Sequence, residues 1–146
     1  MKNIIKTFLV LAVAALVIMP SISYAGEYAV IVNDSNSNSA SQGDIKRMFL
    51  KQQTSWADGT SANPFDRKAD SAEHKAFASK VLGMTEAELA EYWGAEKSKS
   101  GTTPPREIGS DSILTRQVSR KGGGFGVVSS AAANADGVKI LFKFSD

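Results

Sequence analysis

The sequence predicts one α/β domain, a sandwich in which helices cover a mixed or parallel sheet. Short apolar segments typical of buried strands, 28–32 and 125–128, are separated by segments with helical periodicity. The last segment, 138–144, alternates with a period of two, which is typical of a half-exposed edge strand. Because strands interleaved with single helices favour layered α/β arrangements, we expect this class of fold.

The first strand and the first helix are expected on either side of a polar loop. Residues 28–32 are apolar without alternation, which predicts a strand buried on both faces, as in a parallel sheet. Residues 33–39 form a loop rich in Asn and Ser. Ser41 predicts a helix N-cap, and Asp44 favours the positive end of that helix. Its apolar face is predicted from the spacing of Ile45, Met48 and Phe49.

A turn and a very short strand are expected before the second helix. The pair Asp58-Gly59 is a turn signal, and residues 63–65 have room only for a very short strand. The helix should begin at Asp70 or Ser71 and end at Gly83, a residue type favoured at helix C-termini. Its buried residues should include Phe77 and Val81.

Two further helices are expected before the last strands. Thr85 and Glu88 have the spacing of a capping box and should open the first of them. Two prolines exclude a helix from the polar loop 98–105, so the other helix should occupy about 110–120 and end at the glycines 122–124. The expected apolar residues are Leu89, Tyr92 and Trp93 in the first helix, and Ile113, Leu114 and Val118 in the second.

The start of the chain is typical of an export signal. Two lysines precede an apolar run from 8 to 19, and small residues follow at the positions that a signal peptidase reads. The run is shorter than the roughly 20 residues of a membrane span. We therefore expect residues 1–25 to be a signal peptide cleaved after Ala25, and residues 26–146 to be one exported, periplasmic domain.

The composition excludes several classes of function. Removing the two lysines of the leader reduces the 17 basic residues to 15, equal to the 15 acidic residues. A neutral chain does not predict nucleic-acid binding, which depends on a basic face. Without cysteine there is neither a thiol nucleophile nor a thiolate zinc site. Because His74 is the only histidine, we predict no catalytic residue, no metal, no cofactor and no enzymatic activity.

The sharpest candidate for a binding site is Arg67, which lies four residues before a helix N-cap candidate. A guanidinium beside the unpaired N–H groups of a helix N-terminus suits an oxyanion. The candidate ligand residues are Arg67, Asp70, Ser71 and Ala72. The alternative is structural: Arg67 would be a surface residue paired with Asp66 or Asp70, in front of a helix that Asp70 and Glu73 cap.

Two other motifs are interpreted as structural. The glycine-rich run 122–126 lacks the Gly-Lys-Ser/Thr of a nucleotide phosphate loop, and should stop a helix and enter a buried strand tightly. Three aromatic residues could form a ligand platform, but such residues more often pack in a core, so we predict packing. These residues are Trp56, Tyr92 and Trp93.

Several segments, taken in order, resemble the substrate-binding protein of the phosphate ABC transporter. The matching segments are 30–33, 44–50, 56–59, Arg67 with Asp70-Ser71, and 123–128. The third of these resembles the family's tryptophan turn, and the fourth its arginine–acid–serine phosphate motif. The chain departs from the family at Ala72 and Glu73, which replace a glycine and a threonine, and at Lys51, which replaces a common glycine.

The resemblance implies a type II periplasmic-binding fold. Because about 121 residues suffice for one of the family's two lobes, we expect a single lobe with a mixed sheet flanked by helices. It also implies an exported protein that binds an oxyanion, with phosphate as the expected anion, and a membrane transporter or another periplasmic protein as partner. The alternative is a ligand-free structural or partner-binding module on the same fold, whose last strand offers an edge to another chain.

Overall fold

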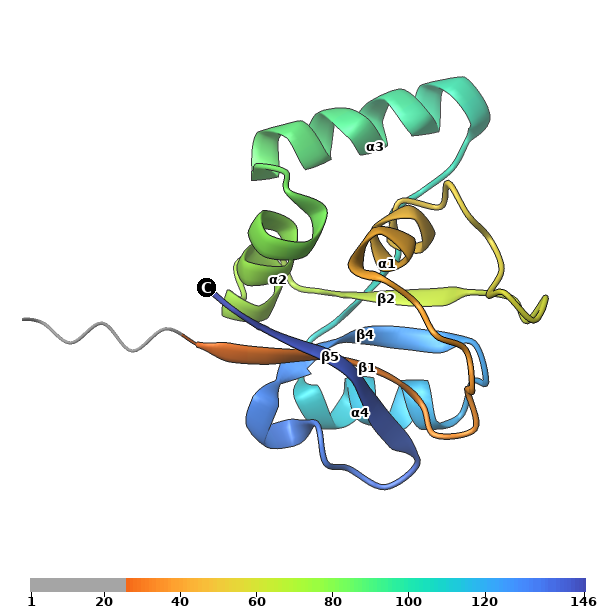
Figure 1. Cartoon of the computed structure of the whole chain (residues 1–146). Helices are drawn as coiled ribbons and strands as arrows, with labels where there is room; N and C mark the ends of the chain where they lie inside the picture. Colours follow the sequence, from red (N-terminus) through yellow and green to blue (C-terminus); the bar gives the residue numbers. More distant parts are fainter. Residues whose placement is uncertain (1–25) are drawn as a thin grey trace, which may run out of the picture.

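The computed structural model describes residues 26–146, so the predicted signal peptide at 1–25 lies outside the described residues. The elements are β1 (Glu27–Asn33), α1 (Gln42–Phe49), β2 (Asn63–Arg67), α2 (Ala72–Phe77), the π-helix η1 (Ala78–Leu82), α3 (Glu86–Ser100), β3 (Arg106–Ile108), α4 (Asp111–Ser119), β4 (Gly124–Ser129), the 3₁₀-helix η2 (Ser130–Ala132) and β5 (Val138–Ser145). Helices α1, α2 and α3 cover one face of the sheet and α4 the other (Figure 1). The predicted α/β sandwich is confirmed. Within this part of the chain, no helix has both the length and the hydrophobicity that a membrane crossing requires.

The sheet is mixed, with the strand order β3-β2-β4-β1-β5. Strand β2 runs parallel to β3 and β4, whereas β1 runs antiparallel to β4 and β5. The prediction that β1 is buried on both faces is confirmed, but the parallel pairing suggested for it is wrong. An unbroken apolar run indicates that a strand is buried on both faces of the sheet. Here helices bury both faces of β1, although its neighbours are antiparallel.

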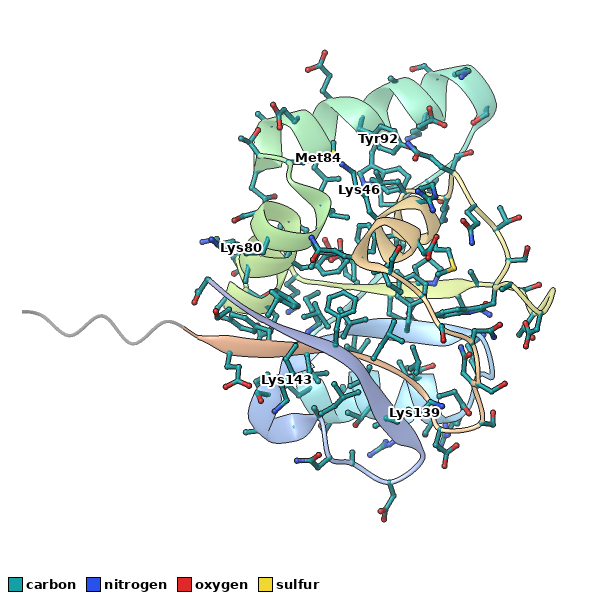
Figure 2. The ribbon with its side chains drawn as sticks, viewed as in Figure 1. Lys46, Lys80, Met84, Tyr92, Lys139 and Lys143 are labelled. Carbon is teal, nitrogen blue, oxygen red and sulfur yellow. The ribbon has the colours of Figure 1, made fainter. Side chains whose placement is uncertain are left out.

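The two edges of the sheet differ in how well the sequence predicts them. Strand β5 lies at one edge and has the expected half-exposed pattern, with Lys139 and Lys143 exposed (Figure 2). Strand β3 forms the other edge and was not predicted. Its three residues directly follow two prolines and are too few to show a period of two.

The predicted helix ends agree closely with the structure. Ser41 and Thr85 form capping boxes with Asp44 and Glu88. Gly83 has a φ of +64° and ends the second helical segment, whose last turn is η1. Helix α3 is longer than expected and reaches Ser100, inside the predicted loop. Of the apolar residues expected in α4, Leu114 and Val118 are buried, whereas Ile113 is 45% exposed.

The core has two parts, one on each face of the sheet. On the α1–α3 face, Trp56 and Trp93 are buried, and Tyr92 donates a hydrogen bond to the Leu50 carbonyl at 2.7 Å. Trp56 Nε1 donates to the Gly123 carbonyl at 3.0 Å, where a Cβ on Gly123 would lie 1.7 Å from a backbone oxygen. The predicted packing of these aromatic residues and the tight glycine entry to β4 are therefore confirmed.

Candidate functional site

Arg67 is a buried residue at the carboxyl end of β2, with 4% of its surface exposed. Its Nε donates to the Ile108 carbonyl at 3.1 Å and its Nη1 to the Val127 carbonyl at 3.2 Å. The same Nη1 makes an ion pair with Asp111. Among the described residues, Nη2 has no hydrogen-bond partner and is not fully buried. The guanidinium is therefore fixed by strands β3 and β4, with one nitrogen left for another acceptor.

Asp111 completes this arrangement from the first turn of α4. Its second carboxylate oxygen accepts a hydrogen bond from Ser129 Oγ at 2.6 Å. Burial opposes ionisation, yet the hydrogen bond from Ser129 and the neighbouring Arg67 outweigh it, so the pKa of Asp111 lies below its usual value. The acid is ionised at neutral pH and compensates the charge of Arg67. The structural alternative had placed Asp66 or Asp70 in this role, whereas the ion pair joins residues 44 positions apart.

The other predicted ligand residues lie at the start of α2. Ser71 is its N-cap: Ser71 Oγ accepts from the His74 N–H at 3.2 Å and donates to the Lys68 carbonyl at 2.6 Å. Asp70 and Ala72 are exposed, and neither forms a hydrogen bond or ion pair with Arg67 in the described part of the chain. Four of the best-formed cavities of residues 26–146 have none of the four predicted ligand residues in their lining.

These elements nevertheless meet at the carboxyl ends of the parallel strands. Strands β2, β3 and β4 run parallel, so their carboxyl ends, marked by Arg67, Ile108 and Ser129, lie side by side. Helices α2 and α4 both begin there. Ligands in open α/β sheets bind outside the carboxyl ends of the strands, where helix N-termini supply N–H groups. Lys68 adds a cation at these strand ends, because its side chain passes close to Gly109, which follows β3. A Cβ on Gly109 would lie 3.4 Å from Lys68 Cε.

A second buried charge network lies on the opposite face of β2, and the sequence did not predict it. His74 Nδ1 lies 2.8 Å from Asp66 Oδ1, and His74 Nε2 lies 3.1 Å from Glu86 Oε2. The bond to Asp66 is the main cause that raises the pKa of His74 to about 9, against the opposing effect of burial. His74 is therefore a protonated structural residue at neutral pH. Within residues 26–146 no group of three or more His, Asp or Glu residues could hold a metal ion.

The fold is of the type seen in a single lobe of periplasmic binding proteins. Neither a protein-family model nor a curated protein matches the sequence. Solved structures do. An ABC-type phosphate transport receptor from Vibrio cholerae superposes with a TM-score of 0.61 at 20% identity, over 80% of this chain and 45% of the receptor.

Two further structures agree with this result. A protein described as a phosphate ABC transporter substrate-binding protein, solved with bound phosphate, comes from Clostridium perfringens. It has a TM-score of 0.60 and 18% identity, over 80% of this chain and 44% of its own. PstS from Borrelia burgdorferi has a TM-score of 0.59 and 11% identity, over 82% of this chain and 48% of PstS. The chain thus shares its fold with phosphate receptors and spans less than half of their length.

Proposed function

We propose that this protein is an exported oxyanion-binding domain that captures phosphate at the carboxyl ends of β2, β3 and β4, without chemical conversion. The observation that carries the proposal is the state of Arg67. Two backbone carbonyls and one carboxylate fix its guanidinium, while Nη2 has no partner among the described residues. A guanidinium held in this way loses little entropy when an oxyanion binds.

The neighbouring groups give the anion its geometry. Ala72 can contribute an N–H group from the start of α2, and the exposed Lys68 contributes charge. The Ser71 N–H, which the sequence had suggested as a donor, already donates to the Lys68 carbonyl at 2.9 Å. Glu73, which replaces a threonine of the family motif, contributes to raising the pKa of Tyr28 of β1. We infer that Asp70 stays in solvent at the rim of the site.

Asp111 gives a reason for phosphate selectivity. A carboxylate next to the bound anion repels a fully deprotonated oxyanion, but it accepts a hydrogen bond from hydrogen phosphate. Sulfate carries no proton at neutral pH and cannot make that bond. We therefore expect phosphate to bind more tightly than sulfate.

Isothermal titration of the purified protein with phosphate and with sulfate tests the proposal. Arg67→Lys should keep the positive charge but lose the fork geometry, and should weaken phosphate binding by about tenfold. Asp111→Asn should reduce the preference for phosphate over sulfate. The control is Arg116→Gln, which removes an exposed cation from the middle of α4. If wild-type protein gives no heat with millimolar phosphate, the proposal is wrong.

A second candidate function is binding of a protein partner through β5. The strand is eight residues long and pairs with β1 alone among the described strands, so its outer edge is open. Such an edge can accept a strand from another chain, although Lys139 and Lys143 disfavour indiscriminate pairing. We infer a transporter subunit or another periplasmic protein as the partner. Light scattering with Leu141→Pro as the comparison tests it: an assembly that persists in the variant excludes the edge.

A further inference from the structure

We propose that the protein has a second ligand site, at the opposite ends of the same strands, which binds a small phosphate monoester. We call this site the basic notch. It is a cavity of about 340 Å³ where β2 and β3 begin and α4 ends. Its principal lining residues are Lys51, Asn63, Phe65, Arg106, Gln117 and Lys121.

The notch exists because β3 is shorter than β2. Strand β3 begins at Arg106, which pairs with Phe65. Asn63 and Pro64 therefore have β4 on one side and no strand on the other. The sheet edge is open over these two residues, and Pro64 has no N–H with which to recruit a further strand. The cavity is thus a consequence of strand length, and its size falls within the range of small-molecule sites.

The charges of the notch all have one sign. Lys51, Arg106 and Lys121 line it, and no Asp or Glu does. Neither Arg106 nor Lys121 makes an ion pair with a described residue. Successive side chains of β3 point to opposite faces of the sheet. The next residue, Glu107, therefore lines a different cavity, which it shares with Asp66 and His74. The strand therefore separates its two charges and leaves the notch without a counter-ion from the described chain.

Lys51 provides an independent observation. Its φ of +58° lies in the left-handed region that favours glycine, and among the described residues it is the one non-glycine with a positive φ. It follows the Leu50 C-cap of α1, a position where helices commonly use glycine. A lysine here costs stability that glycine would not. Its side chain crosses to Thr103, where Nζ donates to the carbonyl at 2.7 Å, and lines the notch. Strain of this kind is found where a side chain serves a function.

The lining defines the ligand. Three cations suit a dianion, and a phosphate monoester carries about −1.5 to −2 charges at pH 7. The planar fork of Arg106 can hold two of its oxygens, and two amides can complete its shell. The remaining walls are apolar, from Ala62, Pro64, Phe65 and Pro105, and the cavity is larger than an inorganic phosphate ion needs. We therefore assign to the notch an ester with a small apolar body.

Titration of the purified protein with phenyl phosphate tests this assignment, with inorganic phosphate and phenol as comparison ligands. Phenyl phosphate should bind more tightly than either. Arg106→Gln with Lys121→Gln should weaken it by at least tenfold. The control is Lys80→Gln, which removes one exposed cation on η1, far from the lining of the notch. Equal binding by the double variant and wild type, or an equal loss in Lys80→Gln, would overturn the assignment.

Lys51→Gly separates function from folding. The variant should bind phenyl phosphate more weakly, while its Tm stays equal to or rises above that of wild type because the backbone strain is removed. A variant that binds as well as wild type would overturn the role of Lys51. Arg67 ends β2 two residues, about 7 Å at roughly 3.3 Å per residue, beyond Phe65, the last residue of β2 that lines the notch, so Arg67→Lys tests whether phenyl phosphate binds at the Arg67 site instead. Loss of binding in Arg67→Lys with retention in Arg106→Gln would place the ester at the carboxyl ends of the strands instead of in the notch.

Discussion

Asp66 and Arg67 are adjacent residues of β2, both are buried, and the two faces of the sheet neutralise them by different means. On the α4 face, two carbonyls and the carboxylate of Asp111 hold Arg67. On the α2–α3 face, Asp66 depends on His74, which also contacts Glu86. The first arrangement keeps its charges throughout the neutral pH range. The second depends on one histidine proton, so only this face should respond to pH.

The comparison also distinguishes charges that position the fold from charges that await a ligand. Buried charges require partners, because an unpaired ion in a protein interior costs several kcal/mol. Both β2 residues have such partners. The cations of the basic notch are solvent-accessible, need no partner to be tolerated, and are left to bind an anion. Arg67 combines both roles, since its Nε and Nη1 are paired within the fold, whereas Nη2 has no partner among the described residues.

The largest effect is expected from Arg67→Met. The change leaves the Asp111 carboxylate with Ser129 as its remaining side-chain donor and removes the donors to two carbonyls. The free energy of unfolding should fall by about 3–5 kcal/mol, as when one partner of a buried pair is removed. Urea denaturation measures it. The control is Arg47→Met, which breaks an exposed pair with Asp44 and should cost less than about 1 kcal/mol. Equal losses in both would contradict the burial argument.

The next effect is a pH dependence that belongs to His74. Its pKa of about 9 in the folded protein exceeds the 6.5 of the free side chain. Its contribution is therefore complete below pH 6.5 and is lost as pH rises through 9, at up to about 3 kcal/mol. Urea denaturation between pH 6.5 and 9.5 should show this decline in wild type, and His74→Gln should show a flatter profile. An unchanged slope in His74→Gln would assign the decline to other groups.

The smallest effect is expected from Glu86→Gln. The Glu86 side chain is 50% exposed, so solvent screens its bond to His74, and unfolding free energy should fall by no more than about 0.5–1 kcal/mol. The pKa of His74, followed by NMR, should nevertheless decrease, because Glu86 contributes to its elevation. Asp66→Asn should lower that pKa further, since Asp66 is the main cause. A larger decrease in Glu86→Gln than in Asp66→Asn would reverse this order.

Local features of the fold could be predicted from sequence. Ser41, Thr85 and Gly83 begin or end helices through contacts within five residues, and the unbroken apolar run of β1 indicates its burial directly. Strand direction could not be predicted, because the same run suits parallel and antiparallel neighbours. Strand β3 was missed because three residues carry no period.

The site was harder to predict because its contacts join distant parts of the chain. Arg67 could be singled out from its place before a helix N-cap, but its ion pair with Asp111 joins residues 44 positions apart. The pair of Asp66 and His74 joins residues eight positions apart, across a turn, where no helical or strand spacing relates them. Lys51 was noticed as a substitution for a common glycine, and the structure supplies the reason: the position requires a positive φ.

The position of β1 between β4 and β5 has a consequence for the order of folding. Tyr28 pairs with Ser129 on one side and with Phe144 on the other, so the first strand has no partner within the next ninety residues of chain. Closing such long loops is slow compared with forming local contacts. A growing chain would therefore keep an apolar segment unpaired until almost its last residue is made. Delayed closure of this kind is compatible with the export proposed above, in which the chain would fold after crossing a membrane.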